Sequence, residues 1–389
     1  MQKVGVLGGT FDPIHQGHLH LARQALELAG LDRVVILPMA RPAHRETEAP
    51  ADMRYAMCRL TLEGQERISL SQAGMQPSVR YTADTMPLLA KEFPGARFYL
   101  ILGADKLPSL PYWRDADKLF AQCEFLCFPR SGVATEEAMD KARAAGARVQ
   151  LLPVECSPYS STMIRAATAQ YEDAPGVDKK VLCYMAENGL YQPDFLPKLK
   201  GMMNPRRFRH TLGVRKEAVR LAALHGLSIQ KAAVAGVLHD CAKGMPVSVM
   251  AQIAQEYRLV KDKQMMDSGA MLHGPVGAHI AKYRFGIRDG DILQAIRNHT
   301  IGRPGMSDLE LCIFVADATE ENREDYDGLN AIRRLAEHSL AAAALKSLQM
   351  TQEYLRKSNR PFFPIAQRTA EELESRLTEQ QKIWMDQMD

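Results

Sequence analysis

Two histidines stand three residues apart near the start of the chain, in the run G-G-T-F-D-P-I-H-Q-G-H at positions 8–18. Glycines without a Cβ let backbone N–H groups approach phosphate oxygens, and the N-terminus of a following helix adds positive partial charge. The glycine between the histidines permits a tight turn, so His15 and His18 can converge on one phosphate chain. The spacing fits neither the G-x-G-x-x-G loop nor the P-loop. We expect a nucleotide-phosphate site here; the alternative is a glycine-rich turn in which two histidines fall by accident.

A second set of chemically active residues lies in the other half of the chain: His210, His239, Asp240, His273, His299 and Asp317. Each falls inside or beside a helical apolar pattern, where an unpaired polar group would be costly to bury. Imidazole and carboxylate groups suit divalent ions such as Fe, Mn, Co, Ni or Zn, and the scattered cysteines do not favour a structural zinc site. A single histidine is more simply a core or surface residue, as we expect for His225, His279 and His338. The ordered set, with its adjacent His–Asp pair, predicts a metal site.

Two different patterns of hydrophobicity position these residues. In the first half, short β-branched or aromatic runs at 3–7, 33–37 and 97–102 alternate with helical patterns such as 17–30, where Gly30 supplies the stop. This alternation indicates βαβ units on a parallel sheet. From residue 206 onward the pattern is helical almost throughout. We therefore expect an α/β, Rossmann-like domain with a parallel sheet, followed by an all-α domain.

The pattern changes across residues 192–205, which contain three prolines and a glycine. We expect a first domain over 1–191, a linker over 192–205 and a second domain over 206–389. In the second domain, Ser307 and Glu310 have the spacing of a capping box at the start of a helix. The polar segment 366–388 predicts one further helix, an appendage or an oligomer contact.

Composition limits the class of protein. With 389 residues, two domains are the default, and the net charge of +3 gives no electrostatic reason to expect a nucleic-acid or membrane partner. The seven cysteines contain no C-x-x-C pair, the N-terminus lacks the apolar centre of a signal peptide, and no apolar run approaches the ~20 residues that span a bilayer. We expect a cytoplasmic protein with reduced cysteines. The sequence does not determine its oligomeric state, and a homo-oligomer is one of the alternatives.

Longer stretches of the first half resemble one enzyme family. Residues 8–18 resemble the nucleotidyltransferase signature. Residues 38–44 (P-M-A-R-P-A-H), 81–85 (Y-T-A-D-T), 102–105 (L-G-A-D) with Trp113, 160–165 (S-S-T-M-I-R) and 184–191 resemble segments of bacterial nicotinate-nucleotide adenylyltransferase. Pantetheine-phosphate adenylyltransferase shares H-x-G-H, but the Y-T-x-D-T and G-A-D…W stretches favour the nicotinate enzyme. The resemblance covers residues 1 to about 191.

This resemblance implies a role for each matching residue. ATP would bind to Gly8, Gly9, Thr10, Phe11, His15, His18, Ser161, Thr162 and Arg165, and nicotinate mononucleotide to His44, Tyr81, Thr82, Asp84, Thr85, Asp105 and Trp113. The 5′-phosphate of the mononucleotide would attack the α-phosphorus of ATP, while Mg²⁺ and the cations of His15, His18 and Arg165 neutralise developing charge. The products would be deamido-NAD and pyrophosphate. Judged alone, Tyr81 and Thr85 are equally core or capping residues, and Trp113 a loop anchor.

The second half is similar to HD-domain phosphohydrolases, which carry the order H…HD…H…H…D. Residues 209–214, 272–278, 298–307 and 316–317 resemble bacterial symmetrical diadenosine-tetraphosphate hydrolases, which form two ADP. The resemblance implies one metal ion on His210, His239, Asp240 and Asp317, and a second on His273 and His299 with Asp240 bridging. Two such ions activate a hydroxide and polarise a phosphate. The family suggests a binuclear iron centre, while the ligands alone also admit manganese, cobalt or nickel.

Three cations are candidates for binding the polyphosphate chain: Lys243, Arg303 and Arg323. Each is equally a solvated surface charge on its pattern alone, but Asn322-Arg323 keeps the family's spacing after Asp317, which favours Arg323. Two alternatives stay open for this half. It acts on other nucleotides, such as a nucleoside triphosphate or a guanosine alarmone, or it is a nucleotide-sensing module. Loss of a metal ligand would indicate the second alternative, and none is missing.

Overall fold

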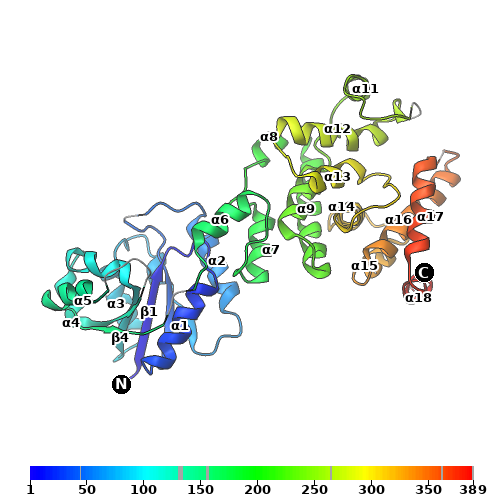
Figure 1. The fold of residues 1–389 in the computed structure, drawn as a ribbon. Helices are drawn as coiled ribbons and strands as arrows, with labels where there is room; N and C mark the ends of the chain where they lie inside the picture. The colour runs from blue at the N-terminus through cyan, green and yellow to red at the C-terminus, as the bar shows by residue number, and fades with distance from the viewer. Residues whose placement is uncertain (44, 130–134, 155–156, 263–264, 361, 388–389) are drawn as a thin grey trace. The chain divides into compact units, whose positions relative to one another are not determined.

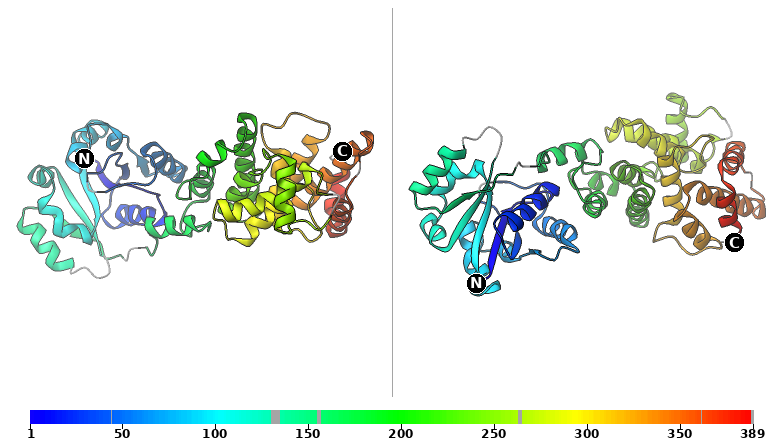
Figure 2. Two further views of the ribbon diagram at one scale, coloured as in Figure 1. Left: turned by 90° about the horizontal axis from the view of Figure 1, so that it is seen from above. Right: turned by 60° about the horizontal axis from the view of Figure 1, so that its bottom comes forward.

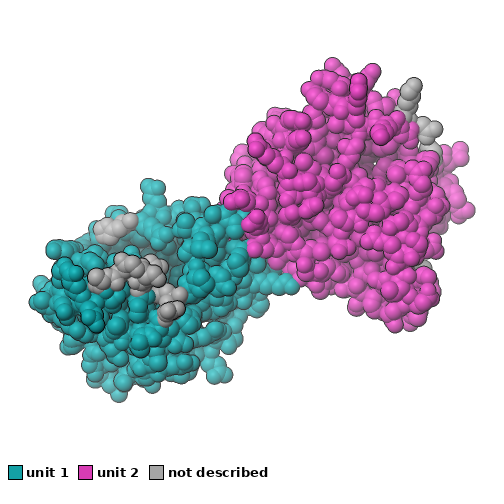
Figure 3. Space-filling model, viewed as in Figure 1, with its two compact units in different colours: residues 1–168, 174–184 teal, residues 169–173, 185–389 magenta. Residues whose placement is uncertain are grey.

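The chain forms two compact units (Figure 3). The computed structural model describes residues 1–43, 45–129, 135–154, 157–262, 265–360 and 362–387. Unit 1 comprises Met1–Thr168 and Ala174–Tyr184, and unit 2 comprises Ala169–Asp173 and Met185–Asp389. Among the described residues, no helix is both long enough and apolar enough to cross a bilayer.

Unit 1 is built on a six-stranded sheet in the order β3-β2-β1-β4-β5-β6, and the strands pair in parallel throughout. The strands are β1 Lys3–Gly9, β2 Arg33–Pro38, β3 Ile68–Leu70, β4 Arg97–Gly103, β5 Cys123–Phe128 and β6 Val149–Leu151. Their apolar runs are buried on both faces, as parallel sheets require. This is the Rossmann-like α/β domain that the sequence predicted.

Helices cover both faces of this sheet (Figures 1 and 2). The helices of the first half are α1 Gln16–Leu28, α2 Ala51–Leu62, α3 Thr82–Glu92, α4 Ala116–Gln122, α5 Thr135–Ala144, α6 Ser161–Ala169 and α7 Lys179–Asn188, with 3-10 helices η1 Ala73–Met75 and η2 Ala104–Tyr112. Helices α6 and α7 follow the last strand, and the end of α7 belongs to unit 2. Side chains of α3, η2, α4 and α5 form one core with alternate residues of the strands. Helices α1 and α2 pack on the sheet through their own apolar faces.

The strand order changes direction at β1, since the chain builds outward from β1 through β2 to β3 and then returns to β4 on its other side. Ligands of open α/β sheets bind at the carboxyl ends of the strands beside such a point. The segments that follow β1 and β4 therefore meet at the binding edge, and these segments carry the H-x-G-H run and Asp105.

Unit 2 is helical, as the sequence predicted. Its helices are α8 Leu196–Lys200, α9 Pro205–His225, α10 Ile229–Leu238, α11 Val247–Glu256, α12 Gly269–Arg284, α13 Gly290–Asn298, α14 Asp308–Thr319, α15 Leu329–Ala336, α16 Leu340–Lys357, α17 Pro364–Arg376 and α18 Glu379–Gln387. Helix α10 is buried on all sides and lies against α9, α13 and α14. This central position explains why its sequence lacks a polar face.

The expectation of one helix over 366–388 was wrong, because the segment forms α17 and α18 with a break at Leu377–Thr378. Thr378 and Gln381 explain the break: the N–H of Thr378 donates to the Gln381 side chain at 2.9 Å, and the N–H of Gln381 donates to the Thr378 hydroxyl at 3.3 Å. This reciprocal arrangement starts a new helix. Helix α17 also packs on α16 of its own chain and buries Leu373 there.

Unit 2 also contains residues that precede the expected linker. The carboxylate of Asp173 accepts hydrogen bonds from the N–H groups of Ile229 at 2.8 Å and Gln230 at 2.9 Å, the first two residues of α10. The buried Arg215 of α9 donates to the carbonyl of Ala186 at 2.7 Å. Residues 192–205 themselves include α8, so they are partly helical. Segments that the sequence patterns placed in the first domain therefore complete hydrogen bonds of the second.

The capping box at Ser307 and Glu310 is confirmed at the start of α14, where the Ser307 hydroxyl accepts the N–H of Glu310 at 3.3 Å. We predict that Ser307→Ala destabilises unit 2 by about 1 kcal/mol, because one N–H at the helix start loses its acceptor. Urea unfolding followed by circular dichroism measures this change. An unchanged midpoint for the unfolding of unit 2 would show that water replaces the hydroxyl without loss.

Candidate functional sites

The structure brings the two histidines of the H-x-G-H run together at the start of α1. The Nδ1 atom of His15 accepts the N–H of Gly17 at 3.1 Å, and the Nδ1 atom of His18 accepts the N–H of His15 at 3.2 Å. The two ring centroids lie 3.8 Å apart. A Cβ at Gly17 would lie 2.9 Å from atoms of the His15 ring, so this position requires glycine. The run therefore fixes both rings through the backbone of the same turn.

These hydrogen bonds also determine where the histidines carry their protons. A ring nitrogen that accepts a hydrogen bond has no proton, so in the neutral ring the proton lies on Nε2. Burial lowers the pKa of His15 to about 4, which keeps this ring neutral at pH 7. The expectation that His15 acts as a cation concerns the complex with ATP and stays a prediction. A neutral His15 offers an Nε2–H donor instead of a positive charge.

Helix α6 lies against the same loop. It begins at Ser161, whose hydroxyl donates to the carbonyl of Pro13 at 2.9 Å, while Thr162 is exposed on its first turn. The guanidinium of Arg165 donates to the carbonyl of Asp12 at 2.8 Å and also pairs with the carboxylate of Glu48. The H-x-G-H run and the S-S-T-M-I-R motif, whose contacting residues are 153 positions apart, are thus in direct contact.

Several residues expected at the mononucleotide pocket take part in local structure. The carboxylate of Asp84 accepts the N–H groups of Arg80 and Tyr81, both at 2.9 Å, and so caps α3. Thr85 is buried, and its hydroxyl donates to the carbonyl of Thr82 at 2.6 Å. For Asp84 and Thr85 the observed contacts are those of a helix start.

The aromatic residues of this region, Tyr81 and Trp113, are half-buried and also contact other side chains. The guanidinium of Arg114 lies 4.9 Å from the ring centre of Tyr81. Trp113 packs partly against the core, and its indole N–H donates to Ser109 at 3.2 Å. Asp105, half-buried at the start of η2, lies 3.2 Å from the ammonium of Lys106. The remaining residue assigned to this pocket, His44, lies outside the described residues.

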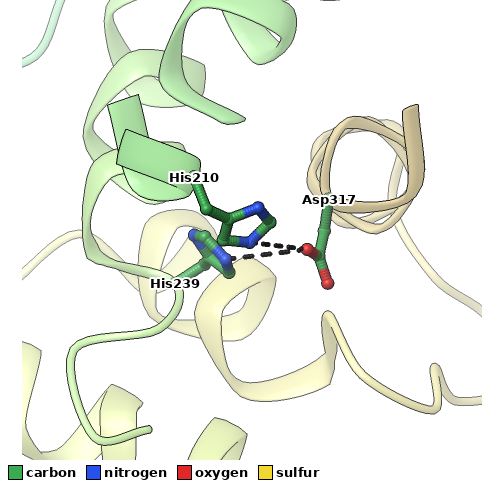
Figure 4. Close-up of side chains that lie close together, drawn as sticks. All are labelled: His210, His239 and Asp317. Carbon is green, nitrogen blue, oxygen red and sulfur yellow. Dashed lines mark ion pairs between the residues drawn. The ribbon is translucent and has the colours of Figure 1, made fainter. Parts of the chain in front are cut away.

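In unit 2 the six predicted ligand residues come together from five helices or helix ends, and Figure 4 shows three of them, His210, His239 and Asp317. His210 projects from α9, His239 and Asp240 follow α10, His273 lies on α12, His299 ends α13, and Asp317 lies on α14. The Nε2 atoms of His210 and His239 lie 3.1 and 3.8 Å from the Asp317 carboxylate. Residues up to 107 positions apart in sequence therefore surround one point.

Asp240 stands between two pairs of imidazoles. One of its oxygens lies 3.8 Å from Nε2 of His210 and 3.5 Å from Nε2 of His239. The other lies 3.2 Å from Nε2 of His273 and 3.5 Å from Nε2 of His299. Burial alone would raise the pKa of Asp240, but the neighbouring histidines hold it well below its usual value. An ionised carboxylate with one oxygen on each side has the arrangement of a bridging ligand.

The donor set fits divalent metal ions. The Nε2 atom of His239 is buried and has no hydrogen-bond partner among the described residues, and that of His210 is buried between the carboxylates of Asp240 and Asp317. The Nδ1 atoms of His239 and His299 lie 2.7 Å from the carbonyls of Gly236 and Ile296, so each ring donates there and directs its Nε2 lone pair toward the centre. Such buried, unpaired acceptors are costly unless a ligand satisfies them.

Sequence reasoning missed Glu320, which is 1% exposed and lies just after α14. Its carboxylate lies 3.0 Å from Nδ1 of His210 and accepts the N–H of Asn322 at 2.6 Å. Burial would lower the pKa of His210, but hydrogen bonds to Asp317 and Glu320 raise it. Glu320 therefore orients His210. This role becomes visible only when the fold brings Glu320 next to His210 on α9.

Cations surround the metal ligands. Arg323 pairs with the carboxylate of Asp317, and the ammonium of Lys243 lies 3.1 Å from Nε2 of His273. Arg207, which the sequence analysis did not single out, donates to Asp240 at 2.6 Å. Arg303 instead forms a two-point pair with the buried carboxylate of Glu310, at 2.8 and 2.7 Å. Arg303 therefore holds the start of α14, whereas the other three face the ligand set.

A cavity of about 850 Å³ opens beside His210. It is lined mainly by charged and polar side chains from the start of α9 and the segment after α14: Asn204, Arg206, Arg207, Arg209, Glu320, Asn322, Arg323, Glu324, Asp325 and Tyr326. Four of these lining residues are arginines, and their charges suit a chain of phosphates.

The other histidines of unit 2 lie elsewhere. His225 contacts the carbonyl of Ala336, His279 packs on the ring of Tyr257, and His338 packs on the ring of Trp384.

Comparison with known proteins finds relatives of both halves of the chain. Residues 6–167 match the model of the cytidylyltransferase-like family, and residues 207–322 match the HD domain. A protein of Mycoplasma genitalium named "Probable nicotinate-nucleotide adenylyltransferase/Ap4A hydrolase" is 30% identical over 364 residues, which cover 91% of this chain and 99% of that protein. The chain belongs to this two-domain family.

Relatives of each half also exist as separate proteins. The symmetrical bis(5′-nucleosyl)-tetraphosphatase of Bacillus subtilis is 40% identical over 167 residues, which cover 43% of this chain and 88% of that protein. A protein of Gloeobacter violaceus named "Probable nicotinate-nucleotide adenylyltransferase" is 35% identical over 201 residues, covering 49% of this chain and 96% of that protein.

We predict that Glu320→Gln weakens metal binding about 10- to 100-fold, because the neutral amide no longer holds the His210 ring as firmly. Metal content after dialysis against graded chelator, measured by mass spectrometry, tests this without an activity assay. Glu321→Gln is the matched control, since Glu321 is exposed and pairs with Lys216. If the two variants retain metal equally, Glu320 has no such role.

Proposed function

We propose that this chain is a bifunctional enzyme. Unit 1 transfers AMP from ATP to nicotinate mononucleotide, giving deamido-NAD and pyrophosphate, and unit 2 hydrolyses diadenosine tetraphosphate to two ADP. The relative that matches almost the whole chain carries both activities in its name. The observation that carries the first activity is the contact of the H-x-G-H loop with Arg165, and that for the second is Asp240 between its histidine pairs.

For the transfer, the chain's residues bind and orient the phosphates, and no protein nucleophile is needed. The Nε2–H groups of His15 and His18 are donors on one side, and Arg165 brings a guanidinium from α6. Donors fixed before the reaction stabilise charge that develops at the α-phosphorus and on the leaving pyrophosphate. Mg²⁺ accompanies ATP in this proposal, and Tyr81 and Trp113 are the aromatic surfaces for the pyridine ring.

For the hydrolysis, His210, His239, Asp240 and Asp317 would hold one metal ion, and His273, His299 and Asp240 a second. When bound, such ions polarise a phosphate and lower the pKa of water, and iron is the ion that we propose. Three cations contact the proposed metal ligands directly: Arg207, Lys243 and Arg323. In this proposal they bind the phosphate chain where it approaches the metal ions. The arginine-lined cavity beside His210 then accommodates the rest of the substrate.

We predict that His18→Ala lowers deamido-NAD formation by about 10²-fold or more, the loss expected when a preorganised donor is removed. Initial rates at saturating ATP and nicotinate mononucleotide measure it. His20→Ala is the control, because His20 lies on the same helix two residues further on. Near-normal turnover by the His18 variant would exclude its proposed role.

We further predict that replacing both His239 and Asp240 with alanine empties the metal site and abolishes hydrolysis of diadenosine tetraphosphate, since an imidazole and the bridging carboxylate are lost. Deamido-NAD synthesis should survive, because its phosphate ligands lie in residues 8–18 and 160–165. Product chromatography should show only ADP from the unaltered chain. ATP plus AMP would contradict the symmetrical reaction, and loss of transfer by a folded double variant would contradict independence of the two sites.

A further inference from the structure

One fully buried charge in unit 1 has no part in the transfer as described so far. Arg54 of α2 has no exposed surface. Its guanidinium donates to four backbone carbonyls: those of Thr10 at 2.6 Å, Met39 at 2.9 Å, Ala40 at 3.0 Å and Ala49 at 3.1 Å. Nothing in the sequence patterns distinguished this arginine from the exposed Arg59 of the same helix.

The carbonyls that it binds lie at the binding edge of the sheet. Thr10 directly follows β1, and Met39 and Ala40 directly follow the neighbouring β2. These strands pair as far as Gly9 and Pro38, and the N–H of Met39 donates to the carbonyl of Gly9 at 2.9 Å. Arg54 therefore joins the loop of the H-x-G-H run to the loop that follows β2.

The bond to Thr10 sets the direction of a backbone donor. In a trans peptide unit the C=O and the following N–H point in opposite directions. Because the carbonyl of Thr10 points to Arg54, the N–H of Phe11 points away from the guanidinium. Phe11 has a φ of +49°, which non-glycine residues seldom adopt, and its ring lies 4.9 Å from that of His18. The orientation of this peptide is thus imposed by Arg54 and not by local preference.

The same network reaches Arg165. The carboxylate of Asp12 accepts the N–H groups of Glu48 at 2.8 Å and Ala49 at 3.1 Å, and the carbonyl of Ala49 is in turn bound by Arg54. The backbone carbonyl of Asp12 accepts the hydrogen bond from the guanidinium of Arg165. A change at Arg54 would therefore move both the backbone donor at Phe11 and the support of Arg165.

We propose that Arg54 is a positioning residue for adenylyl transfer, which fixes the Thr10–Phe11 peptide and the support of Arg165 so that both face the phosphates of ATP. This proposal rests on the transferase function proposed above. Lysine cannot replace it, since one ammonium nitrogen does not reproduce the planar set of donors that spans four carbonyls.

The test compares Arg54→Lys with Arg59→Lys in the full chain. Arg54→Lys should lower kcat/KM for transfer about 10²-fold, with a raised KM for ATP and a lower kcat, because small displacements of phosphate ligands have effects of this size. Hydrolysis of diadenosine tetraphosphate and metal content should stay unchanged, as should every property of the Arg59 control. Unaltered kcat and KM in a folded Arg54 variant would overturn the proposal, even if its Tm falls.

A second measurement tests the proposal even if the Arg54 variant does not fold, because it uses the unaltered chain. Amide hydrogen exchange of the unaltered chain, followed by NMR with and without α,β-methylene-ATP, should show slower exchange at Phe11 when the analogue binds. Binding of the analogue without any change at Phe11 would overturn the proposal. Failure of the unaltered chain to form deamido-NAD would instead refute the transferase function itself, so the two failures are distinguishable.

Discussion

A buried carboxylate must have partners, and the arrangement of unit 2 depends on how Asp240 finds them. Asp240 is 3% exposed, and a charge so placed is stable only beside compensating groups. The compensation comes from the guanidinium of Arg207, from imidazoles on α9, α12 and α13, and from His239 beside it. The helices of this unit are therefore held at the distances that their side chains need around one anion. A metal centre built on this frame requires no large rearrangement of the ligands.

Unit 1 presents a contrasting case, because the charge of its fully buried Arg54 is positive. Arg54 is bound by backbone carbonyls, which carry no net charge and belong to loops instead of to helices. The consequence differs accordingly. In unit 2 side chains from several helices gather around the carboxylate of Asp240. In unit 1 the single side chain of Arg54 holds two loops in a fixed conformation. Both arrangements place the reactive groups where rigid elements end, at strand ends in one unit and helix ends in the other.

The sequence was sufficient for the fold class and for several helices of unit 2, because these depend on hydrophobic period. The six predicted metal ligands do lie together, although they are spread over more than a hundred positions. The sequence did not predict β3 or β6, which have three residues each and too little pattern to recognise, and it also missed the six-residue strand β5. It also missed Glu320 and Arg54, since the partners of both lie at distant positions in the sequence. Asp84 and Thr85 matched a family motif, yet the structure shows them holding a helix start. A motif thus records that a residue type is needed, but not whether a ligand or the backbone needs it.

The capping of α10 by Asp173 bears on how the two enzymes can change over evolutionary time. The chain enters unit 2 at residue 169, returns to unit 1 at residue 174 and enters unit 2 again at residue 185. An insertion or deletion between these points would displace residues of both units. The length of an ordinary flexible linker, in contrast, can change without affecting the domains that it joins. The two units therefore share the segment 169–184 of the chain, and a change in its length affects both of them.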